Sequence, residues 1–122
     1  MSDLQDITLD QLVPELHGSQ VDVTIHVTSK LNITAFTARQ SVSGLALSQI
    51  GTGVGADEPK LLVSRSRLLW RVPLFLALPR LGRLGEIGAI DVDAQTGEVL
   101  ADDIRIEALI HNARRLAPDI AP

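Results

Sequence analysis

The sequence predicts an α+β domain, in which an antiparallel sheet of about four strands carries helices packed on it. Three observations lead to this fold class. Residues 67–78 form a long, strand-like apolar segment, residues 86–101 have the pattern of a closing hairpin, and residues 34–50 have helical periodicity. No repeat, low-complexity tract or long linker divides the chain, so residues 1–122 are expected to form one domain.

The N-terminal residues are expected to supply a further strand. Residues 1–19 have a mixed pattern in which Pro14 interrupts a possible short helix. Residues 20–28 alternate strictly between apolar and polar side chains, which is the clearest strand pattern in the chain.

Residues 34–50 are predicted to form an amphipathic helix that begins at Asn32 or Thr34. Its apolar stripe should pack against a sheet face that contains Trp70 or Val72; this stripe includes Ala38, Val42, Leu45 and Ala46. Gly44 lowers helix propensity, so we expect it to mark a close contact with a strand.

Residues 51–59 are interpreted as a flexible loop. Their three glycines resemble a phosphate-binding loop, but they follow a helix and lead to Pro59, whereas a nucleotide-binding loop follows a strand. Short and long strands are predicted at 60–63 and 67–78. Pro73 cannot donate a hydrogen bond, which suggests an edge position or a bulge.

The last third of the chain is predicted to form a loop at 79–85, strands at 86–92 and 98–101, and a closing helix. Gly97 is expected to adopt a positive φ in the turn between the two strands. Asp102 or Asp103 should cap the helix.

Composition favours a cytoplasmic protein without catalytic activity. Cysteine is absent, the first ten residues carry three aspartates and no basic residue, and no apolar run approaches the roughly 20 residues that span a membrane. No nucleophile or acid–base arrangement is readable, and no cofactor is expected. The net charge of −4 and the scarcity of aromatic residues argue against nucleic-acid binding.

Residues 60–83 carry six basic residues and no acidic one, whereas the rest of the chain holds five basic and fifteen acidic residues. Such a stretch can simply complement acidic neighbouring strands. The alternative is an anion-binding or small-ligand-binding face, whose candidate residues are Arg65, Arg67, Arg71, Arg80 and Arg83.

Metal binding is not expected. None of the three histidines has a second histidine or a carboxylate at a familiar metal-ligand spacing; they are His17, His26 and His111. Several aspartates could converge near the last hairpin as a weak calcium or magnesium site, namely Asp91, Asp93, Asp102 and Asp103. Turn formation and helix capping explain them more simply.

The strand at 67–78 is apolar on both faces, whereas a small sheet covered by helices on one side needs only one apolar face. Closed two-fold dimers commonly bury such a second face. We therefore expect a homodimer whose interface includes Leu69, Phe75 or Ala77.

The stretch from Gly88 to Leu100, with its D-A-Q-T-G-E-V sequence, resembles the closing hairpin of PepSY-type domains. The larger run from Trp70 to Val99 also resembles small uncharacterised bacterial proteins. PepSY-type domains are non-catalytic and bind or restrain partners, and they have no active-site residues to carry over. The resemblance implies an interaction or regulatory module with a protein partner.

Overall fold

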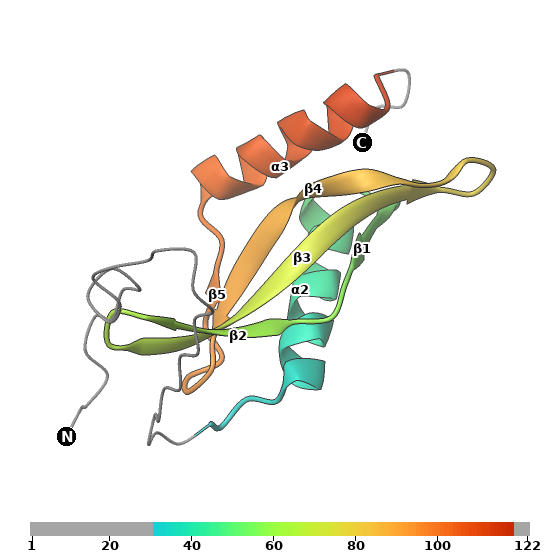
Figure 1. The fold of residues 1–122 in the computed structure, drawn as a ribbon. Coiled ribbons are helices and arrows are strands. Elements are labelled where there is room, and N and C mark those ends of the chain that lie inside the picture. Colours follow the sequence, from blue (N-terminus) through green and yellow to red (C-terminus); the bar gives the residue numbers. More distant parts are fainter. Residues whose placement is uncertain (1–30, 119–122) are drawn as a thin grey trace, which may run out of the picture.

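The computed structural model describes residues 31–118, so the predicted strand at 20–28 and the possible helix within residues 1–19 lie outside the described residues. These residues form an α+β fold with two helices and an open antiparallel sheet of five strands (Figure 1), which confirms the predicted fold class. In order, the elements are α2 (Ala35–Gln49), β1 (Val54–Ala56), β2 (Lys60–Ser64), β3 (Arg67–Leu78), β4 (Gly82–Asp93), β5 (Val99–Leu100) and α3 (Asp103–Leu116).

Strand β3 is the centre of the sheet. It pairs along its length with β4 on one side and with β1 and β2 on the other, and β5 follows beyond β4. Both helices contribute to one core with the alternate residues Val72, Leu74 and Ile90 of β3 and β4. We call the opposite face of the sheet, which no described helix covers, the outer face; α2 lies behind the sheet in Figure 1.

Helix α2 begins where the sequence predicts. The Oγ1 atom of its N-cap, Thr34, accepts a hydrogen bond from the backbone N–H of Thr37 at 3.1 Å. Three of the four predicted core residues, Ala38, Val42 and Ala46, are fully buried, and Leu45 is partly buried against the same core. The prediction for Gly44 is wrong, because this residue is exposed and a Cβ there would lie farther than 4 Å from every described strand.

The predicted loops are shorter in the structure. Strand β1 lies inside the predicted loop at 51–59, and β4 begins at Gly82, inside the predicted loop at 79–85. The pairing of β3 with β4 shifts register twice near this end. Because of their glycines and bulges, neither segment has the local sequence pattern of a strand. Their extended conformation comes from pairing with β3.

The edge position inferred from Pro73 is wrong, because β3 has neighbours on both sides. Pro73 O accepts a hydrogen bond from Asp57 N at 2.8 Å, so the backbone of Pro73 faces the β1 and β2 side. There β1 has ended and β2 has not begun. The missing N–H of Pro73 therefore faces a break between two neighbouring strands, where no ladder donor is needed.

The closing hairpin and helix follow the predicted pattern, although β5 is shorter than the predicted strand at 98–101. Gly97 has φ +83°, which confirms the predicted turn conformation. Asp102 is the N-cap of α3 and accepts a hydrogen bond from Arg105 N at 2.8 Å. Helix α3 packs closely on β4, because a Cβ on Gly88 would lie 2.6 Å from Leu109 Cδ2.

Candidate binding sites

Three arginines of the basic stretch form ion pairs with carboxylates of neighbouring strands and loops. Arg71 Nε and Nη2 donate to the two carboxylate oxygens of Asp91 at 2.9 and 3.0 Å. Arg67 Nη2 donates to Asp93 at 2.8 Å. The Arg71 and Asp91 side chains face each other across the β3–β4 ladder, where opposite charges are stabilising.

The third pair belongs to an aromatic contact on the outer face. Arg83 donates to both carboxylate oxygens of Asp57 at 3.0 and 3.1 Å, and its guanidinium carbon lies 3.6 Å from the centroid of the Phe75 ring. Gly55 is the cross-strand partner of Phe75, and because it has no side chain it leaves room for the Phe75 ring. Phe75 is thus covered within one chain.

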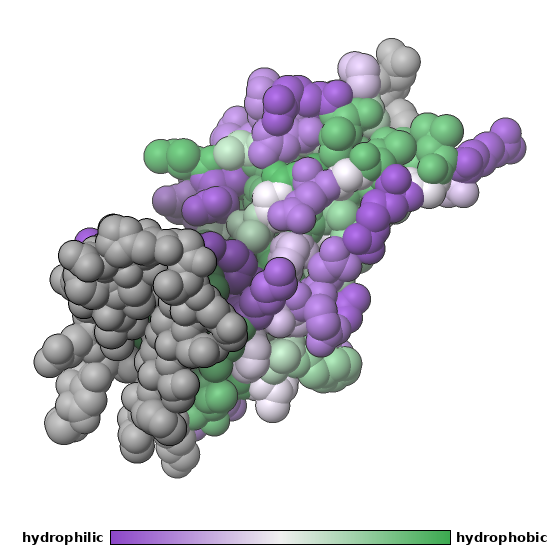
Figure 2. Space-filling view, in the orientation of Figure 1, coloured by the Kyte–Doolittle hydropathy of each residue, from purple (hydrophilic) through white to green (hydrophobic). Residues whose placement is uncertain are grey.

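The five candidate arginines do not converge. Arg65 lies in the turn between β2 and β3, whereas Arg80 lies in the turn between β3 and β4, at the opposite end of β3. Figure 2 shows hydrophilic side chains spread across the sheet instead of one patch. This arrangement favours the interpretation in which the basic stretch complements acidic neighbours, and anion binding stays a prediction.

The predicted dimer-interface residues lie on the outer face. Leu69 is only 7% exposed, and Ala77 and Phe75 are half-buried. The stems of long arginine side chains can cover apolar surface of this kind while their charged ends remain in water. The second apolar face of β3 is therefore covered to a large extent by residues of the same chain.

The acidic residues near the last hairpin have structural roles. Asp93 Oδ1 accepts hydrogen bonds from the backbone N–H groups of Gln95 and Thr96, which holds the turn. Burial raises the pKa of Asp93, but the hydrogen bonds from Arg67, Thr96 and Gln95 and the Arg67 charge outweigh it and hold the pKa below its usual value.

Within residues 31–118 no group of three or more histidine, aspartate or glutamate side chains could hold a metal ion. His111 is exposed on α3. His17 and His26 lie outside the described residues.

Within residues 31–118, strand β2 lies at an edge of the sheet, and its side chains leave apolar surface exposed. Leu61 and Val63 are 44% and 39% exposed on the face that also carries their cross-strand partners Trp70 and Leu68. Among the described residues β2 pairs with β3 alone.

The backbone groups of β2 alternate in direction. Leu68 O accepts a hydrogen bond from Ala94 N, so even-numbered residues of β3 face β4, and odd-numbered ones such as Leu69 face β2. Leu62 is paired with Leu69 and therefore faces β3. The N–H and C=O groups of Leu61 and Val63 consequently point away from the sheet.

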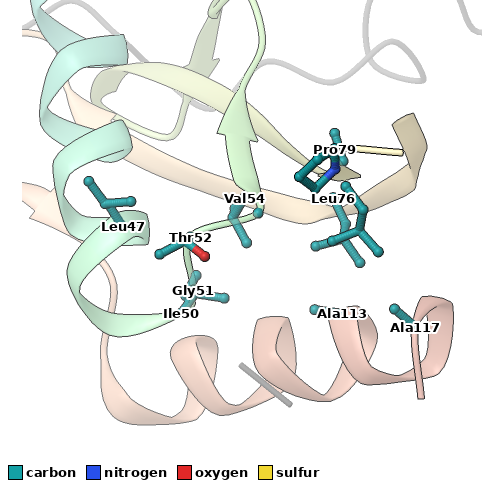
Figure 3. A pocket seen from close by; sticks show the side chains of 12 residues that line it. Leu47, Ile50, Gly51, Thr52, Val54, Leu76, Pro79, Ala113 and Ala117 are labelled. Carbon is teal, nitrogen blue, oxygen red and sulfur yellow. The ribbon is translucent and has the colours of Figure 1, made fainter. Parts of the chain in front are cut away.

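An apolar hollow lies at the other end of β3. It has a volume of about 670 Å³ and is enclosed by the end of α2 and the turn after it, by β1, by the end of β3 and by the last turns of α3. Figure 3 shows side chains from these elements pointing into one space, among them Leu47, Ile50, Val54, Leu76, Ala113 and Ala117. None of the described lining residues is charged.

The comparisons with known proteins do not extend this picture. No family model matches the chain, and neither a curated protein nor a solved structure matches it. No helix in the described part of the chain is long and apolar enough to cross a membrane.

Proposed function

We propose that this chain is a non-catalytic cytoplasmic interaction module that pairs with a partner strand along β2, and that its first partner is a second copy of the chain. The observation that carries this proposal is the regular β2 edge, whose outward backbone groups belong to the exposed residues Leu61 and Val63. An edge of this kind is a template for strand addition.

Two other edge positions, on β1 and on β4, support the choice of β2, because side chains of the same chain already bond to their carbonyl groups. Arg39 Nε donates to the carbonyl oxygen of Ala56 at 2.9 Å on the edge of β1. Asn112 Nδ2 donates to the carbonyl oxygen of Ile87 at 2.8 Å on the edge of β4. Register shifts also disturb β4, and such irregularity protects an edge from pairing.

A second copy is favoured because β2 is self-complementary around Leu62. Antiparallel pairing about a two-fold axis at Leu62 places Leu61 opposite Val63 of the other copy, so the outward backbone groups meet. Lys60 then lies opposite Ser64, and no like charges oppose each other. The resemblance of residues 88–100 to PepSY-type hairpins also supports a non-catalytic role with a protein partner.

Sedimentation equilibrium at micromolar concentration tests the proposal. The wild-type chain should have twice the 13.1 kDa mass of one copy. Val63→Pro should be monomeric, since proline removes an outward N–H and leaves the β2–β3 ladder in place. Val63→Thr keeps the N–H and the β-branched shape, so it should dimerise more strongly than Val63→Pro.

A further variant, Phe75→Ala, distinguishes a dimer that pairs through β2 from one that forms through the outer face. Phe75 pairs with β1, beyond the end of β2, so Phe75→Ala should leave a β2-mediated dimer intact. A monomeric wild-type chain would refute the dimer. Dissociation by Phe75→Ala but not by Val63→Pro would place the interface on the outer face instead.

A further inference from the structure

The cavity at the end of β3 has walls that belong to the packed core. Ile50, Leu76 and Ala113 line it and are at most 7% exposed. The backbone of its glycine-containing rim is also fixed, because Gly51 N donates to Ala46 O at 3.0 Å and Ala77 N donates to Gly53 O at 2.8 Å. The hollow is therefore a preformed feature of the fold.

Small residues create the space. The cavity is lined by small residues from three parts of the chain, none with a side chain beyond Cβ: Gly51, Gly53, Ala77, Ala113 and Ala117. A volume of about 670 Å³ is within the range of small-molecule sites, which is roughly 300–1,000 Å³.

The chemistry of the lining selects the ligand. Among the twelve described residues that line the cavity, Thr52 supplies the one polar side chain, its hydroxyl, and none of the twelve carries a charge that could pair with a charged ligand. Burial of an unpaired charge is strongly unfavourable. We propose that this cavity binds an uncharged, largely apolar small molecule, such as a medium-chain alcohol, with any single hydroxyl directed toward Thr52.

This site is independent of the proposed pairing function. The cavity involves the end of β3 from Leu76 onward, whereas β2 pairs with residues 67–71 at the start of β3. Binding of the ligand should therefore persist in Val63→Pro, and loss of one function leaves the other measurable.

The test uses the full chain and an uncharged fluorescent dye, N-phenyl-1-naphthylamine. Its fluorescence should rise saturably with one dye per chain. Dodecan-1-ol should displace the dye, and dodecanoate, which has the same chain length and a negative charge, should compete at least about tenfold more weakly because its carboxylate would lack a partner. Equal or better competition by dodecanoate would overturn the proposed ligand class.

Two cavity variants and one surface control show where the dye binds. Ala113→Leu fills the cavity from α3 and should weaken dye binding about tenfold or more. Ala108→Leu makes the same change on the exposed face of α3 and should have no effect. Thr52 is exposed at the rim, so Thr52→Phe should also block the cavity, and it decides the question if Ala113→Leu does not fold.

Unchanged dye affinity in the folded cavity variants would overturn the proposal. The same holds for tighter dye binding by Ile120→Asp than by the wild type, because that result would assign the cavity to the chain's own last residues.

Discussion

Asp93 combines several interactions in one buried carboxylate. Its side chain accepts hydrogen bonds from Arg67 and from two backbone N–H groups of the turn. The sequence indicated that the basic stretch complements acidic strands. It did not indicate the strand register that brings Arg67 near Asp93. Pairing partners depend on strand register, and the bulges in β4 shift that register.

Because its pKa is lowered in the folded chain, Asp93 stabilises the fold above its unfolded pKa of about 4, and this contribution is lost as the pH falls through the folded value. Asp93→Asn should lower the unfolding free energy at pH 7 by on the order of 2 kcal/mol, since the charge-assisted bond to Arg67 is lost. Urea unfolding from pH 7 to pH 2 measures this. The difference between wild type and variant should shrink toward pH 2, and a constant difference would contradict the assignment.

Gly97 is required by the same turn. Its φ of +83° is costly for β-branched residues, so Gly97→Val should destabilise the chain by on the order of 1–2 kcal/mol. Gly97→Asn should cost less, because asparagine tolerates left-handed backbone. Denaturation midpoints measure both changes, and an unchanged midpoint for Gly97→Val would rule out this role.

Among the elements, the long and strongly patterned ones were predictable. The bounds of β3 match the prediction, and α2 and α3 differ little from it, because apolar periodicity and capping residues specify them locally. Strand β1 was missed, since it has three residues, follows Gly53 and contains Gly55, and so has no periodicity of its own. Pro73 was misread as an edge residue, because a break in a neighbouring strand is a tertiary feature.

Helix α2 contains an opportunity for stabilisation. Gly44 is exposed in its interior and has free space around it, so Gly44→Ala should raise the unfolding free energy by about 0.5–1 kcal/mol. Gly88→Ala is the contrast and should destabilise, because its φ of +141° is strained for alanine and its Cβ would lie 2.6 Å from the buried Leu109 side chain. Thermal unfolding of both variants checks the pair, and a loss of stability in Gly44→Ala would show that Gly44 has a contact beyond the described residues.

At the scale of the whole molecule, the sequence predicted the α+β class but not the candidate sites. The cavity is formed by small residues that are up to about seventy positions apart, and alanine or glycine at such positions carries no pattern that distinguishes a cavity from ordinary packing. The expectation of an uncovered apolar face followed from the two apolar faces of β3. The contact of Arg83 with the Phe75 ring, which covers part of that face, was not predicted from the sequence.

Assembly should be visible in thermal stability. If β2 pairs with a second copy, the melting temperature of the wild-type chain should rise with protein concentration, because association stabilises the folded state by mass action. The melting temperature of Val63→Pro should be independent of concentration. Calorimetric scans across a hundredfold range of protein concentration, which is worth about 2.8 kcal/mol of association free energy, give the comparison. Parallel behaviour of the two proteins would contradict pairing through β2.

The break opposite Pro73 should also let β1 and β2 separate from β3 independently of each other. Strands β1 and β2 share β3 as a neighbour. Between their two ladders lies Pro73, which has no N–H and accepts one backbone bond, from Asp57, so one strand can separate from β3 while the other stays paired. Strand β1 is held by α2 and by the Arg39 bond to Ala56, whereas four of the five residues of β2 are exposed. In the monomer, the amides of β2 that bond to β3 should therefore exchange with solvent deuterium through local opening, well before those of β1. The central strand would then take part in two opening units that differ in free energy, with proline as the boundary between them.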